Sequence, residues 1–193
     1  MNFEKKLLEI QKWVHREVSP GRYRHILGVV TSSTRLARKY GVSIGKTRLA
    51  AMLHDGAKGL TQDEMKYWLK KDKVPLDRWE KELPNLWHPH VAAVIAFRKW
   101  GVKDSDILEA IRCHTIGKAD MKPIAQVIFV ADFIEPNRDF PGVALARRAA
   151  NRSLREGVLM KARMTMEFLL QEKKRVHPRL LETWNGFRGR ESK

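Results

Sequence analysis

The hydrophobic residues of this chain recur mainly at intervals of three and four, which is the period of an α-helix with one buried face. No segment alternates apolar and polar residues in the way that predicts a strand. The pattern therefore predicts an all-α fold with about seven to nine helices. We expect them at residues 3–18, 20–40, 43–55, 61–71, 91–100, 105–114 and 124–134, with the remainder after residue 142.

Boundary residues support several of these helices. Ser19 followed by Pro20 is typical of an N-cap and a first helical position, and Gly41 can end the same helix. Thr61 and Glu64 have the spacing of a capping box. The charged segment 75–82 fits no regular pattern, so we assign no element there.

The size and composition are those of one globular domain. The chain has 193 residues, of which 43% are hydrophobic and 31% charged, and it contains no repeat. The single cysteine, Cys113, excludes an internal disulfide framework, and we expect it to be a buried structural thiol. The longest nearly apolar run, 124–134, is too short to span a bilayer, and the N-terminus lacks the apolar core of a signal peptide. We therefore expect a cytoplasmic protein without a membrane anchor.

The net charge of +16 is the unusual property of the composition. Half of the excess lies after residue 141, where 13 Lys or Arg residues face 5 Glu and no Asp. Such a surface attracts polyanions, including nucleotide phosphates and RNA. Two interpretations remain open, a solvated basic face of helices and a surface that binds RNA or the ribosome. The tryptophan content, six residues, makes a homodimer plausible.

The residues with the greatest chemical interest are a histidine and an aspartate side by side, His54 and Asp55, after an apolar helical run. Imidazole and carboxylate are suitable ligands for iron, manganese or zinc. Asp132 interrupts the most apolar helix, where a carboxylate needs a cation or a metal to offset its desolvation. A His-Asp pair alone is more often a polar helix end, so its meaning depends on partners elsewhere. The candidate partners are His25, His88 and His114.

The order H…HD…H…H…D on a helical chain resembles the HD superfamily of metal-dependent phosphohydrolases. Longer strings resemble the motifs of the YqeK-type HD hydrolases, which split diadenosine tetraphosphate symmetrically into two ADP. The resemblance covers about residues 20–185. It implies a single HD domain over residues 1–193, with a core at about 20–185, an N-terminal amphipathic helix at 3–18 and a basic tail at 186–193. The matching strings are RYRH at 22–25, HDGAK at 54–58, IRCHTIG at 111–117, VADFIEP at 130–136, NRDFPGV at 137–143 and HP at 177–178.

Carried over by position, the resemblance implies a divalent metal, expected to be iron with manganese or zinc as alternatives. The implied metal ligands are His25, His54, Asp55 and Asp132. An optional second metal would use His88 and His114, and the neighbouring His90 is an alternative ligand. The implied substrate-binding residues are His25, His88, His114, Thr115, Asp132, Arg138, Arg175 and His177.

His54 and Asp55 are the expected catalytic pair, because a metal held there activates a water and takes up charge on the phosphoryl group. We add Lys58, one turn further on, as a point charge for a phosphate or the bridging oxygen. An ion pair with Asp55 is the alternative role for this lysine.

We therefore expect an enzyme that hydrolyses diadenosine tetraphosphate through a metal-activated water. One alternative is an HD phosphohydrolase acting on another nucleotide. The other is a basic protein that binds RNA or the ribosome and keeps only the HD scaffold. The complete set of histidines and aspartates favours the enzyme.

Overall fold

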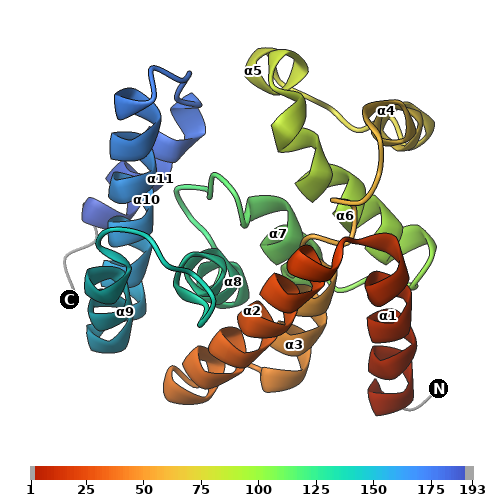
Figure 1. Ribbon diagram of the computed structural model, residues 1–193, viewed down its shortest axis with the longest axis horizontal. Coiled ribbons are helices and arrows are strands. Elements are labelled where there is room, and N and C mark those ends of the chain that lie inside the picture. Colours follow the sequence, from red (N-terminus) through yellow and green to blue (C-terminus); the bar gives the residue numbers. More distant parts are fainter. Residues whose placement is uncertain (1–2, 190–193) are drawn as a thin grey trace.

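The computed structural model describes residues 3–189, and every regular element in this part of the chain is helical (Figure 1). The all-α prediction is thus confirmed. The elements are α1 (Phe3–Glu17), α2 (Pro20–Lys39), α3 (Ile44–Leu53), α4 (Gln62–Lys71), α5 (Arg78–Glu82), the 3₁₀ turn η1 (Pro84–Leu86), α6 (Trp87–Arg98), α7 (Ser105–Cys113), α8 (Pro123–Ile134), α9 (Val143–Arg152), α10 (Leu154–Gln171) and α11 (Pro178–Arg188).

The predicted caps form as the sequence indicates. Ser19 accepts the N–H of Arg22 at the start of α2, and Thr61 and Glu64 form a reciprocal capping box at the start of α4. Gly41, which ends α2, has a φ of +65°, a left-handed conformation that favours glycine.

The eleven α-helices within residues 3–189 exceed the predicted seven to nine. One addition is α5, in the segment left unassigned, where Asp77 caps the Trp79 and Glu80 N–H groups. Its five residues are too few to show a hydrophobic period, so only the cap marks it. The basic tail expected from residue 186 begins inside α11, and residues 190–193 of that tail lie outside the described residues.

Helix α8 lies at the centre of the molecule, where it packs against α2, α3, α7, α9 and α10 (Figure 1). Its residues from Val127 to Ala131 are fully buried, which explains why this helix is apolar on every side. Helices α2, α3 and α7 lie on one side of it and α10 on the other, and α11 packs on α10. A side chain near the C-terminal end of α8 therefore reaches residues from both halves of the chain.

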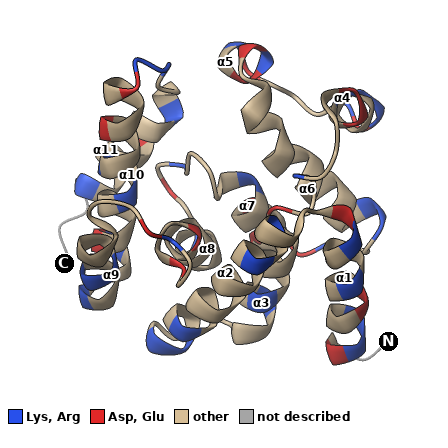
Figure 2. Ribbon diagram, in the orientation of Figure 1, with Lys and Arg blue, Asp and Glu red and all other residues tan. Residues whose placement is uncertain are grey.

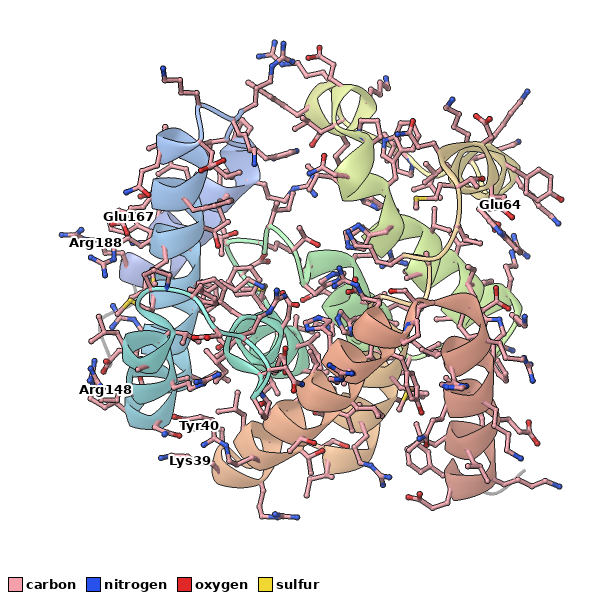
Figure 3. All side chains as sticks on the ribbon, in the orientation of Figure 1. Lys39, Tyr40, Glu64, Arg148, Glu167 and Arg188 are labelled. Carbon is pink, nitrogen blue, oxygen red and sulfur yellow. The ribbon has the colours of Figure 1, made fainter. Side chains whose placement is uncertain are left out.

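Basic residues are spread over most of the helices, as Figure 2 shows. One of them helps to fasten two helices together: Lys39, at the end of α2, and the neighbouring Tyr40 donate hydrogen bonds of 2.6 Å to backbone carbonyls of α9 (Figure 3). Part of the excess charge thus has a structural use. Between residues 3 and 189, no helix combines the length and the apolar character that crossing a bilayer requires.

Candidate metal and phosphate site

Four helices bring four histidines and one aspartate identified from the sequence to one place. His25 comes from α2, His54 and Asp55 from the end of α3, His88 from the first turn of α6 and His114 from the end of α7. We call these five residues the central cluster. They form two overlapping sets of three donors, His25 with His54 and Asp55, and Asp55 with His88 and His114, each with its donor atoms within 4.8 Å of one another. Asp55 belongs to both sets.

Three of the histidines are oriented by the same local device. His54, His88 and His114 each place Nδ1 at 2.6–2.8 Å from a backbone carbonyl three residues earlier. A carbonyl only accepts, so each Nδ1 carries the proton and each Nε2 presents a lone pair. The lone pairs point into the cluster, where Nε2 of His88 and Nε2 of His114 are 3.1 Å apart. This orientation is the usual one for metal-binding histidines.

The donor set fits a divalent metal ion. Nε2 of His25, Nε2 of His54 and Oδ1 of Asp55 are buried and make no hydrogen bond. A buried polar atom without a partner costs free energy, which a cation among these atoms would recover. Imidazole nitrogens and a carboxylate are the ligands that zinc, iron and manganese accept in proteins.

The protonation states also suit metal binding. Burial lowers the pKa of His54 to about 4 and the pKa of His88 well below its usual value, so both rings are neutral near pH 7. Burial raises the pKa of Asp55, but the surrounding imidazoles, His54 foremost, outweigh burial and hold it well below the usual value. His54 and His88 therefore present neutral imidazoles beside an ionised carboxylate.

Asp132, on α8, lies at the edge of the central cluster. Its Oδ1 is 3.1 Å from Nε2 of His25 and 3.1 Å from the Arg138 guanidinium, and its Oδ2 accepts a 2.8 Å hydrogen bond from Lys161. The Lys161 ammonium group is buried, also bonds the His114 carbonyl, and lies 4.2 Å from the Phe129 ring centroid. One oxygen of Asp132 is thus fixed by Lys161 while the other faces His25.

Sequence reasoning did not single out three residues that shape this site. Arg22 donates a 2.8 Å hydrogen bond to Oδ2 of Asp55, Glu135 lies 3.2 Å from Nδ1 of His25, and Lys161 holds Asp132. Arg22 and Glu135 lie within the strings that carry the family resemblance. Lys161 lies next to Ala162 in an apolar helical stripe. A lysine at that position is the feature of the sequence from which its burial could have been predicted.

The other predicted site residues lie at different distances from the cluster. The Thr115 hydroxyl is 3.4 Å from Nε2 of His88, so this residue belongs to the site. Lys58 is exposed and has no ion pair within 4.0 Å among residues 3–189, so the alternative role as an Asp55 ion pair finds no support. The protein around its ammonium group, followed by Arg22, nevertheless lowers the Lys58 pKa against the opposing charge of Asp55.

Arg175, His177 and His90 do not join the central cluster. Arg175 forms an exposed ion pair with Glu82, and buried His177 has Nε2 at 3.1 Å from Oδ2 of Asp77. His90 faces Glu80 at 2.8 Å, because it is two residues along α6 from His88 and points to another side of the helix. Asp77, Glu80 and His177 form a second group of donors within 4.8 Å, which we call the α5–α11 cluster. Arg179 bonds both of its carboxylates, at 2.8 and 2.9 Å.

Two cavities flank the central cluster. One, of about 280 Å³, is largely apolar and is lined by residues that include Asn85, Ile116, Arg175 and His177. It adjoins the cluster because Asn85 accepts the hydrogen bond from His88 and Ile116 follows Thr115. The other, of about 360 Å³, borders His25 and Arg138 on the α2 side.

The chain is similar to several known proteins. The model of the HD domain family matches residues 22–137. The chain is 38% identical over 172 residues to the "Bis(5'-nucleosyl)-tetraphosphatase, symmetrical" of Bacillus subtilis (strain 168), covering 89% of this chain and 92% of the relative. It is 36% identical over 164 residues to the protein of the same name from Halalkalibacterium halodurans, covering 85% and 87%.

A solved structure is also similar over nearly the whole chain. It is a crystal structure from Clostridium acetobutylicum described as a "predicted HD superfamily hydrolase involved in NAD metabolism", with a TM-score of 0.91 and 30% identity over 95% of this chain and 97% of that one. The match to the family model, the two long relatives and the shared fold all point to the same family. The chain therefore belongs to the HD-domain family, in the group of the symmetrical bis(5'-nucleosyl)-tetraphosphatases.

Proposed function

We propose that the protein is a metal-dependent hydrolase that splits diadenosine tetraphosphate symmetrically into two ADP. The observation that carries this proposal is the pair of donor sets that share Asp55, which supplies ligands for a cation beside two cavities. The names of the relatives support the choice of a dinucleoside tetraphosphate over other nucleotides.

His25, His54, Asp55 and Asp132 would hold the principal metal, for which we propose iron, with manganese and zinc as alternatives. His88 and His114, together with Asp55, would hold a weaker, optional second ion. A divalent ion bound there lowers the pKa of a water molecule and neutralises negative charge on the phosphoryl group. With no cysteine among its donors, the cluster can accept any of the three metals.

Other residues of the chain would bind and orient the substrate. His88, His114 and Thr115 face the phosphates, and the Arg138 guanidinium can grip one of them with two hydrogen bonds. Lys58 supplies a cation near the bridging oxygen, and His54 and Asp55 act through the metal that they hold. Arg175 and His177 line the apolar cavity, where one nucleoside would lie.

The test joins metal analysis of the purified protein to a product assay on diadenosine tetraphosphate. We expect about one iron or manganese per chain and ADP as the only product. ATP and AMP as products would contradict symmetrical cleavage. Neither metal nor cleavage, under reducing and metal-supplemented conditions, would overturn the enzyme assignment. Metal without cleavage would keep the metal site and move the search to other nucleotides.

A further inference from the structure

The cavity on the α2 side of the central cluster is bordered by His25 and Arg138, but no part of the substrate has been assigned to it so far. Its volume is about 360 Å³, larger than that of the apolar cavity on the other side. Its lining is polar and contains no Phe, Tyr or Trp side chain. The lining residues that matter here are Ser19, Gly21, Arg22, Arg24, Asn137 and Arg138.

The electrostatic character of this cavity is positive. Three guanidinium groups line it, from Arg22, Arg24 and Arg138. The one carboxylate in the lining, Glu135, is buried and turned toward His25 and the Asn137 N–H. The Arg24 guanidinium is exposed and makes no hydrogen bond or ion pair with any residue between 3 and 189. A cation is therefore available to a ligand at the mouth of the cavity.

The N-terminus of α2 adds a second preference for anions. This 20-residue helix begins at the cavity wall, where Ser19 caps the Arg22 N–H and the Gly21 N–H keeps no partner within the described chain. Free N–H groups and the helix dipole favour a negatively charged ligand at this end. His25, a proposed metal ligand, lines the same cavity.

The cavity is also connected to the catalytic carboxylates. Arg22 bonds Asp55 and Arg138 bonds Asp132, so the same two guanidinium groups touch the proposed metal ligands and line the cavity. A phosphate bound between them would lie next to the metal. A substrate that is cut at its centre has two equal halves, which extend to opposite sides of the central bridging oxygen.

We propose that this cavity binds the second nucleoside diphosphate half of the substrate, chiefly through its phosphates, while the apolar cavity binds the first half. The inference rests on the proposed function for the identity of the ligand. Because the lining has no Phe, Tyr or Trp on which a base could stack, and its one imidazole, His25, is a proposed metal ligand, the cavity holds phosphate and ribose and places little constraint on the second base.

The experiment compares Arg24→Glu with Arg38→Glu. Both are exposed arginines on α2, and the change in net charge is identical. They are separated by 14 residues, or about 21 Å along the helix axis, so Arg38 is a control for charge alone. Calorimetry on metal-loaded protein measures the binding of a methylene-bridged diadenosine tetraphosphate, which cannot be cleaved, and of ADP. Cleavage of diadenosine tetraphosphate is measured in parallel.

We expect Arg24→Glu to weaken binding of the bridged analogue by about 10-fold or more, since charge reversal replaces a phosphate contact with repulsion. Binding of ADP, which fills the apolar cavity first, should change by less than about twofold, and Arg38→Glu should leave both ligands unchanged. Equal effects of the two variants, or equal losses for analogue and ADP in Arg24→Glu, would overturn the inference. Tight binding of the analogue without cleavage would instead contradict the proposed function and leave the second subsite standing.

Discussion

Residues 3–189 contain two clusters of histidine and carboxylate groups that have similar residue types and different hydrogen bonding. In the central cluster, the Nε2 atoms of His25 and His54 and Oδ1 of Asp55 are buried without hydrogen bonds. In the α5–α11 cluster, Arg179 bonds the carboxylates of both Asp77 and Glu80. Arg22 pairs with Oδ2 of Asp55, and Nε2 of His177 is also buried without a hydrogen bond. The difference is that Oδ1 of Asp55 remains open to a cation, whereas every carboxylate oxygen of Asp77 and Glu80 has a hydrogen-bond partner. Residue types alone therefore do not distinguish a metal site from a structural ion-pair network.

The largest effect on this difference is expected from a change to Asp55, the carboxylate that both donor sets share. Asp55→Asn keeps the shape of the side chain and removes its charge. We expect at least about a tenfold loss of bound metal and about a 10³-fold loss of turnover, because the water loses its activating cation. Metal content by mass spectrometry and ADP production provide the measurements.

Asp77→Asn is the matched control in the α5–α11 cluster, and it should keep the metal. An equal loss of metal in both variants would mean that Asp55 acts through general stability. Retention of metal in Asp55→Asn would place the metal elsewhere.

A smaller effect is expected from Gly28→Ala, on the same face of α2 as His25. A Cβ at position 28 would lie 2.1 Å from Oε2 of Glu135, so that carboxylate must move away from Nδ1 of His25. Loss of such a supporting carboxylate typically lowers metal affinity by about 10–100-fold. Metal competition with a chelator measures it.

Gly45→Ala is the control for Gly28→Ala. It is also a helical substitution, and the nearest atom to its Cβ is an ordinary 3.6 Å away. Both variants gain helix propensity, so a difference between them reports the Glu135 contact. Unchanged affinity in Gly28→Ala would show that Glu135 does not support His25.

The sequence predicted some of the residues responsible for these effects and missed others. His25, His54, Asp55 and His114 could be predicted because their order and helical context resemble one family. Helix boundaries at Ser19 and at the Thr61 capping box followed from local chemistry. Helix caps depend on residues that are close together in the chain, so they can be predicted from the sequence alone.

The partners that orient the ligands were harder to predict. Glu135 approaches His25 and Lys161 approaches Asp132 from 110 and 29 residues away, so these contacts exist only after packing. Lys161 is buried because Asp132, the His114 carbonyl and the Phe129 ring surround its ammonium group. A lysine within an apolar stripe indicates a buried ammonium group, but its partner can be identified only from the folded structure.

The α5–α11 cluster should make the free energy of unfolding depend on pH in the acid range. Burial raises the pKa of Glu80, but hydrogen bonds from His90 and the Asp77 N–H, together with Arg179, lower it overall to about 2. The folded pKa is below the usual value, so the ionised group stabilises the fold above pH 4.5 and this contribution disappears as the pH falls toward 2. Its size is at most about 3 kcal/mol.

Urea unfolding of the wild type and Glu80→Gln between pH 6 and 3 tests this prediction. The difference in free energy of unfolding should shrink as the pH falls. Glu82→Gln, an exposed neighbour on α5, should give a small difference with little pH dependence. Parallel curves for Glu80→Gln and the wild type would show that the Glu80 carboxylate does not carry the effect.

The smallest effect concerns Cys113, which precedes His114 at the end of α7 but contributes to neither donor set. Burial, aided by Glu109, raises the pKa of its thiol to about 11, so very little thiolate exists at pH 8. Iodoacetamide at that pH should leave turnover within about twofold of the untreated enzyme, and mass spectrometry should find modification only after unfolding. Rapid modification of the folded protein, slowed by added metal, would make Cys113 a ligand and extend the central cluster by a thiolate. If Cys113 is not modified in the folded protein, Asp55 and the imidazoles alone are the groups that distinguish the central cluster from the α5–α11 cluster.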